Sequence, residues 1–137
     1  MSVYLDANIV VALFVPDALN TRAVALVAGL SEPIVISDIA ALEFASTLAR
    51  LGRAKELTVK AVHEALFNFD SWRASQSNVE VIPADIAMAD AYIRRLDVNL
   101  HGADAIHVAM AARIGAALLT LDVKMKAKAK KVGVAAI

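Results

Sequence analysis

Four acidic side chains occupy places in the chain where the neighbouring residues are mostly apolar. Asp104 heads the run ADAIHVAMAARIGAALL, and Asp6 and Asp122 follow the short apolar segments VYL and ALLTL. Glu43 lies within ISDIAALEFASTLARL. An ionised carboxylate is costly to bury unless a cation or a set of hydrogen bonds compensates its charge. An acid such as Asp104 therefore needs a partner.

The segment around Asp104 offers few partners of its own. His107 lies three residues on, where a helix would bring it close enough to pair with Asp104. Arg113 lies nine residues on, which at about 100° per residue places it roughly on the opposite side of the helix. The simpler interpretation is that Asp104 is an N-terminal acid stabilised by the helix dipole. The alternative is that it serves a cation or a substrate.

The elements that must position these acids alternate between short β-branched segments and longer helical patterns, which is typical of a parallel sheet flanked by helices. Strands are predicted at 2–6, 33–37, 79–83, 117–121 and 132–136. Helices are predicted at 7–14, 18–29, 38–52, 55–75, 84–96, 103–114 and 122–131. We therefore expect a single α/β domain over residues 1–137, with a mainly parallel central sheet of about five strands.

On this scaffold the acids converge. Asp6 and Asp122 follow strands, so both project at the carboxyl edge of a parallel sheet, where open α/β folds bind ligands. Asp104 and Glu43 lie near helix starts that we expect at the same edge. Two carboxylates about 5 Å apart repel by about 3 kcal/mol at an effective dielectric constant near 20. A divalent cation bound between them makes the net interaction favourable. Oxygen ligands without thiolates favour Mg²⁺ or Mn²⁺.

Each acid also has a structural interpretation. Asp6 and Asp122 are good N-cap residues for the helices that follow them. Glu43 belongs to a helical stripe that includes Thr47 and Arg50 and is suited to face water. The metal-site hypothesis therefore depends on the four acids together, not on any single one.

Composition limits the function classes. The chain has no cysteine, which excludes disulfides, thiolate catalysis and cysteine-based zinc sites. Its amino-terminal segment has no basic leader or cleavage site, which predicts a cytoplasmic protein. A net charge of +0 gives no overall argument for nucleic acid. Hydrophobic residues make up 59% and mean hydropathy is +0.61, which indicates apolar surface covered by a partner chain and favours a homodimer.

The segments YLDANIVVALF, ISDIAALEFASTLARL and HGADAIHVAMAARIGAALLTLD, followed by a basic helix and VGV, resemble the PIN domain. The likeness is to the VapC toxins of toxin–antitoxin pairs and covers essentially the whole chain. It implies a Mg²⁺- or Mn²⁺-dependent ribonuclease that leaves 5′-phosphate and 3′-hydroxyl ends and binds a cognate antitoxin. By position, the resemblance implies catalytic and metal-binding roles for four acids: Asp6, Glu43, Asp104 and Asp122. It also implies supporting polar roles for Asn8 and Thr120.

Other residues are candidates for binding RNA or for building the core. A lysine-rich segment follows Asp122, and its cations attract phosphates unless the segment is simply a solvated helix face. We select as RNA-binding candidates Arg50, Lys124, Lys128 and Lys131. His107 lies on a mostly apolar helix and is expected to be packed and hydrogen-bonded within the core.

Two other functions are compatible with strand-end acids. A phosphatase-like α/β domain is one, although the segment DAN lacks the second aspartate of a D-x-D nucleophile motif. A non-catalytic PIN-like interaction module is the other. Metal-dependent cleavage of RNA separates a nuclease from both.

Overall fold

The computed structural model describes all 137 residues and contains a parallel sheet of four strands. The strands are β1 (Val3–Leu5), β2 (Ile34–Ser37), β3 (Ser77–Val79) and β4 (Ala117–Leu119), arranged in the order β3-β2-β1-β4. Val3 pairs with Ile34 on one side and with Ala117 on the other, so β1 lies inside the sheet. The predicted single α/β domain with a mainly parallel sheet is confirmed.

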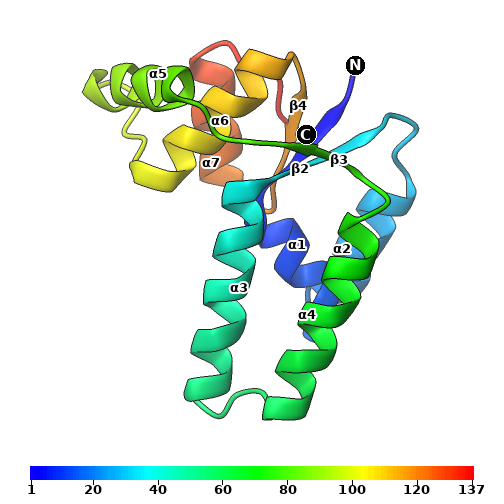
Figure 1. Ribbon diagram of the computed structural model, residues 1–137. Coiled ribbons are helices and arrows are strands. Elements are labelled where there is room, and N and C mark those ends of the chain that lie inside the picture. The colour runs from blue at the N-terminus through cyan, green and yellow to red at the C-terminus, as the bar shows by residue number, and fades with distance from the viewer.

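Seven helices connect and cover the strands (Figure 1). They are α1 (Ala7–Phe14), α2 (Asn20–Ala28), α3 (Asp38–Arg53), α4 (Val59–Arg73), α5 (Pro83–Arg94), α6 (Gly102–Ile114) and α7 (Val123–Lys131). The long helices α3 and α4 run antiparallel and project below the sheet in Figure 1, while α5, α6 and α7 gather on its other side. All seven predicted helices are present, with ends shifted by a few residues.

The alternation of side chains along the strands divides the core into two layers. Tyr4 and Leu118 pack with buried residues of α6 and α7 on one face. Val3, Leu5 and Leu119 pack with buried residues of α1, α3 and α4 on the other face. Helices therefore cover both faces of the sheet and leave its carboxyl edge as the place where polar side chains meet.

The third strand differs from the prediction of 79–83. It spans Ser77–Val79 instead, because the backbone N–H groups that follow it bind side chains and do not extend the ladder. The N–H of Val81 donates to the Asp38 carboxylate at 3.0 Å, and the N–H of Ile82 donates to Asp85 at 2.9 Å. Pro83 then begins α5, a position that suits its fixed φ and missing N–H.

The predicted fifth strand at 132–136 is wrong as a strand. Only one bridge remains, between Leu118 and Ala136. The N–H groups of Val132, Gly133 and Val134 donate to carbonyls at the end of α7, and Gly133 turns the chain with φ of 87°. These residues terminate the helix, so their donors are not available to a strand.

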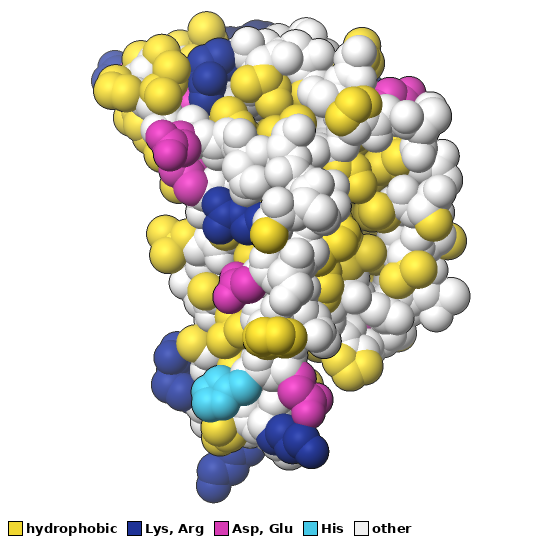
Figure 2. Space-filling view, turned by 45° about the vertical axis from the view of Figure 1, so that its right-hand side comes forward, with side chains coloured by type: hydrophobic (Ala, Val, Ile, Leu, Met, Phe, Trp, Pro, Cys, Tyr) yellow, Lys and Arg dark blue, Asp and Glu magenta, His cyan; other side chains and the backbone are white.

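Apolar side chains remain exposed on several helices. Leu19 precedes α2, Phe67 lies on α4, and Ile86 and Met88 lie on α5 with about half of each exposed. Figure 2 shows hydrophobic side chains over the middle of one face of the molecule, with charged side chains mainly towards its left edge and its lower end. No helix is both long enough and apolar enough to cross a membrane.

Candidate active site

A cavity of about 490 Å³ opens where β1 and β4 end, and all four predicted acids line it. Asp6 enters from the end of β1 and Asp122 from the start of α7. Glu43 enters from α3, and Asp104 from the first turn of α6. The expected convergence at the carboxyl edge is thus present in the structure. Asn8 and Thr47 line the same cavity.

Asp6 is held by a small polar network. It is 5% exposed, and its Oδ2 accepts a hydrogen bond of 2.7 Å from the Thr120 hydroxyl. Asn8 donates to Thr120 Oγ1 at 3.0 Å and accepts from the N–H of Leu121 at 3.1 Å. Asp6 occupies the N-cap position of α1 but makes no side-chain cap hydrogen bond. The capping interpretation therefore does not explain Asp6; its side chain is instead held by Thr120, which Asn8 contacts in turn.

Asp122 does cap a helix. Its Oδ1 accepts from the N–H groups of Lys124 at 2.9 Å and Met125 at 3.1 Å, as the capping interpretation predicted. Its other carboxylate oxygen accepts no hydrogen bond from the protein. Capping and a place in the cavity are thus compatible, because the two oxygens have different surroundings.

Glu43 is half-buried and points towards α6. Its Oε1 lies 2.8 Å from Nε2 of His107, a side chain with no exposed surface. The same nitrogen is 3.9 Å from Oδ1 of Asp6. His107 is therefore a core histidine, as expected, but it pairs with Glu43 and not with Asp104, which forms no ion pair.

Arg113 points away from the acids, as its angular position predicted. Its guanidinium forms a two-point ion pair with Asp85 of α5, at 2.7 and 3.0 Å. The Asp85 side chain is only 1% exposed. This pair joins α5 to α6 outside the candidate site.

The environment of the site raises the pKa values of Asp6, Asp104 and His107. Burial raises the pKa of Asp6, and the charge of His107 and the Thr120 hydrogen bond oppose that rise only in part. Partial burial also raises the pKa of Asp104, with further rises from the charges of Asp122 and Glu43. Burial lowers the pKa of His107, but the hydrogen bond to Glu43 and the charge of Asp6 outweigh it, so the pKa is raised overall.

These shifts predict how stability depends on pH in the metal-free protein. Asp6, Asp104 and His107 all bind a proton more tightly when folded, so each stabilises the fold at low pH and loses that contribution as pH rises through its raised pKa. The window begins near the ordinary Asp value of 3.8 and extends above the ordinary His value of 6.5. Urea unfolding in chelator should therefore show stability falling across this window. The Asp6→Asn protein should show a flatter fall, and an equal slope in both proteins would contradict the assignment.

The donor set suits a hard cation. Each acid keeps at least one carboxylate oxygen that accepts no hydrogen bond from the protein, and oxygen ligands of this kind favour Mg²⁺ or Mn²⁺. No three His, Asp or Glu side chains are gathered tightly enough to coordinate an ion as they stand. A cation would therefore have to draw these side chains inward.

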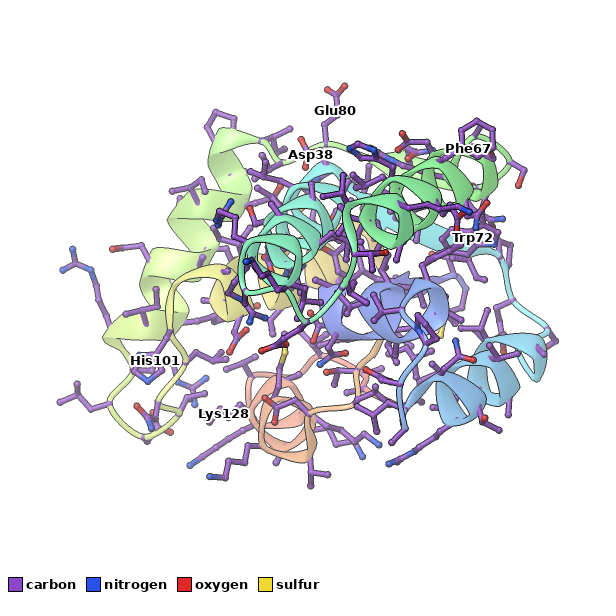
Figure 3. All side chains as sticks on the ribbon, turned by 90° about the horizontal axis from the view of Figure 1, so that it is seen from below. Asp38, Phe67, Trp72, Glu80, His101 and Lys128 are labelled. Carbon is purple, nitrogen blue, oxygen red and sulfur yellow. The ribbon has the colours of Figure 1, made fainter.

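The candidate RNA-binding residues are more scattered than the acids. Lys128 of α7, labelled in Figure 3, lies near enough to Asp104 for its charge to act on that carboxylate. Lys131 donates to the Asp97 carbonyl and lies 4.0 Å from the Asp97 carboxylate. Lys124 and Arg50 are exposed and form no ion pair. Among these candidates, the charge of Lys128 lowers the pKa of Asp104.

Two residues behind the site were not identified from the sequence. The Tyr4 hydroxyl lies 2.6 Å from Nδ1 of His107 and donates to Ser37 Oγ at 2.7 Å. Ser37 also caps α3 by accepting from the N–H of Ala40. A tyrosine within a short strand that is otherwise aliphatic was the only available signal, because a buried phenol needs a polar partner.

Comparison with known proteins gives one consistent result. The sequence model of the PIN domain matches residues 3–131. The chain is also 32% identical to Ribonuclease VapC3 of Pyrobaculum aerophilum over 131 residues, which cover 93% of this chain and 95% of that protein.

Solved structures share the fold. VapC20 of Mycobacterium tuberculosis, described as a toxin that cleaves the sarcin-ricin loop, superposes with a TM-score of 0.73 at 21% identity, covering 92% of this chain and 94% of that one. VapBC2 of Rickettsia felis, solved with a DNA fragment from its promoter, gives a TM-score of 0.70 at 17% identity, covering 100% and 98%.

Proposed function

Since the chain belongs to the PIN-domain family and is related to a VapC ribonuclease over nearly its whole length, we propose that it is a metal-dependent endoribonuclease and the toxin of a toxin–antitoxin pair. One observation carries the proposal: four acids from four different elements line a single cavity at the carboxyl edge of the sheet. Such an arrangement costs stability, so a function that needs clustered negative charge accounts for it best.

The four acids would hold Mg²⁺ or Mn²⁺ and orient water. Asp6 and Asp104 would be the main ligands, and Glu43 and Asp122 would add oxygens or accept a hydrogen bond from the attacking water. Thr120 and Asn8 keep Asp6 in place through the hydrogen bonds described above. When bound, the cation polarises the phosphate and lowers the pKa of water. No side-chain nucleophile is required.

The test is cleavage of RNA with mapping of the new ends. The purified protein should cut RNA in Mg²⁺ or Mn²⁺ and leave 5′-phosphate and 3′-hydroxyl ends, since water displaces the 3′-oxygen. Chelator should stop the reaction, and returning the metal should restore it. Products with 2′,3′-cyclic phosphate, or cleavage that survives chelator, would contradict the mechanism.

The two other functions predict different results. A phosphatase-like domain would form a phosphorylated aspartate with a phosphate donor, and a PIN-like interaction module would leave RNA intact. The cleavage assay therefore separates both alternatives from a nuclease.

We expect an antitoxin protein as the regulatory partner, acting on the chain in the cytoplasm. A partner helix with an apolar face would cover exposed apolar side chains, as amphipathic helices do in hydrophobic grooves. An arginine from that partner would pair with the acids and exclude the metal, because guanidinium binds carboxylates in a two-point geometry. Inhibition would then require no change of fold.

We also expect the isolated chain to form a two-fold homodimer. Exposed apolar side chains such as Ile86, Met88 and Leu96 remain without cover in the single chain. Sedimentation at micromolar concentration should show twice the monomer mass. A strictly monomeric protein would contradict this prediction and leave the high hydrophobic content to be explained by the antitoxin alone.

The lysines of α7 are expected to contact RNA phosphates. Each such contact should steepen the dependence of log K on log salt by about 0.7 for single-stranded RNA. Changing Lys124, Lys128 and Lys131 together to Gln should therefore flatten that slope. Lys60→Gln on α4, where Lys60 pairs only with Glu64, is the matched control. An unchanged slope in the triple variant would mean that these lysines make no phosphate contacts and belong to a solvated helix face.

A further inference from the structure

Glu43 differs from the other acids of the cavity in how it is held. It extends from α3 on a flexible side chain that retains about a third of its exposure, yet Oε1 lies 2.8 Å from a fully buried nitrogen of His107. A carboxylate only accepts hydrogen bonds, so the His107 Nε2 must carry a proton and donate it to Glu43. This contact selects one orientation of the Glu43 carboxylate.

The imidazole is itself held from behind. Its Nδ1 lies 2.6 Å from the Tyr4 hydroxyl, and the Tyr4 and His107 rings meet edge to face with centroids 5.6 Å apart. The Tyr4 hydroxyl also contacts Ser37 Oγ at 2.7 Å. The phenol has a single proton, so it donates to one of these two neighbours and accepts from the other.

The chain of contacts therefore runs from the buried strands to the cavity. Tyr4 lies on β1, Ser37 ends β2, and His107 lies on α6, while Glu43 belongs to α3. All but Glu43 are completely buried, so the rigid part of the network lies in the core and only its last member reaches the site. Such a network fixes a side chain without touching any ligand.

We infer that His107, oriented by Tyr4, is a positioning residue that holds the Glu43 carboxylate ready for the metal-binding site. The inference rests on the proposed function, because it concerns the same cavity. Residues that hydrogen-bond to metal-binding carboxylates typically change metal affinity by about 10- to 100-fold when they are removed. The Glu43–His107 contact is of this kind.

The experiment measures Mn²⁺ binding by calorimetry alongside the unfolding midpoint. His107→Leu should weaken Mn²⁺ binding about tenfold or more, while His107→Gln, which retains an N–H donor, should recover most of the affinity. Tyr4→Phe keeps the ring and removes only the hydroxyl, so it should weaken binding in the same direction and to a smaller extent. His63→Leu, at an exposed histidine of α4, should change nothing.

A double-mutant comparison separates positioning from general loss of stability. His107→Leu should cost little further affinity when Glu43 is already Gln, because the carboxylate to be positioned is gone. The same loss in both backgrounds, unchanged Mn²⁺ affinity in His107→Leu, or unchanged affinity in Tyr4→Phe would each overturn the inference. If His107→Leu does not fold, the Tyr4→Phe and His107→Gln proteins decide.

Different results would overturn the proposed function and the positioning role of His107. Wild-type protein that binds no Mn²⁺ and cuts no RNA would overturn the proposed function and this inference together. Wild-type protein that binds Mn²⁺ and cuts RNA, and loses both properties in Asp6→Asn but neither in His107→Leu, would overturn only the positioning role.

Discussion

Asp6→Asn is expected to reduce RNA cleavage by about a thousandfold or more while leaving the fold intact. The substitution keeps the volume of the side chain, and the Thr120 hydroxyl can still donate to the amide oxygen. What is lost is the buried negative charge at the centre of the acidic cluster. Because that charge raises the free energy of the metal-free protein, Asp6→Asn should unfold at the same or a higher urea concentration in chelator.

Single-turnover cleavage at saturating Mg²⁺ measures the first effect, and urea unfolding measures the second. Asp90→Asn is the matched control, since Asp90 is an exposed acid on α5 that pairs with Arg94 away from the cavity. Its cleavage rate should equal that of the wild type. Full activity in Asp6→Asn at ordinary Mg²⁺ would refute the assigned role of the cavity.

Arg113→Met is expected to produce a large loss of stability outside the site, about 3 kcal/mol. The substitution leaves the Asp85 carboxylate, only 1% exposed, without its two-point partner. The N–H of Ile82 would still donate to Asp85, but one neutral donor cannot compensate a buried charge. For a chain of this size the thermal midpoint should fall by roughly 10 °C.

Thermal unfolding of two further variants tests whether the uncompensated charge of Asp85 causes this loss of stability. Arg94→Met breaks an exposed pair with Asp90 on the same helix and should cost less than about 1 kcal/mol. Adding Asp85→Asn to Arg113→Met should recover part of the loss, because an amide carries no charge to desolvate. A fall of similar size in Arg94→Met and Arg113→Met would contradict the argument from burial.

The place of the acids followed from the sequence for a physical reason. Short β-branched segments alternating with helices require a parallel sheet, and the residues after parallel strands meet at one edge. Asp6 and Asp122 follow such strands, so their common edge was predictable without coordinates. The polar residues Asn8 and Thr120 are close to these acids in the sequence, and in the structure Thr120 donates to Asp6 while Asn8 donates to Thr120.

The ends of helices and strands were less predictable, because each backbone N–H group can donate to any of several competing acceptors. The segment 132–136 has the composition of a strand, but the end of α7 uses the N–H groups of Val132, Gly133 and Val134. In the segment 79–83, the N–H of Val81 donates to the carboxylate of Asp38, which is distant in the sequence. A local pattern carries no information about such a distant acceptor.

Only the tertiary structure decided which buried polar groups meet. His107 contacts Glu43 across 64 residues of sequence and leaves the nearer Asp104 unpaired, and Arg113 contacts Asp85 across 28. Local sequence determines that a side chain is charged and which helix face it occupies. The identity of its partner depends on how α6 lies against α3 and α5, and that packing is set by the whole apolar core.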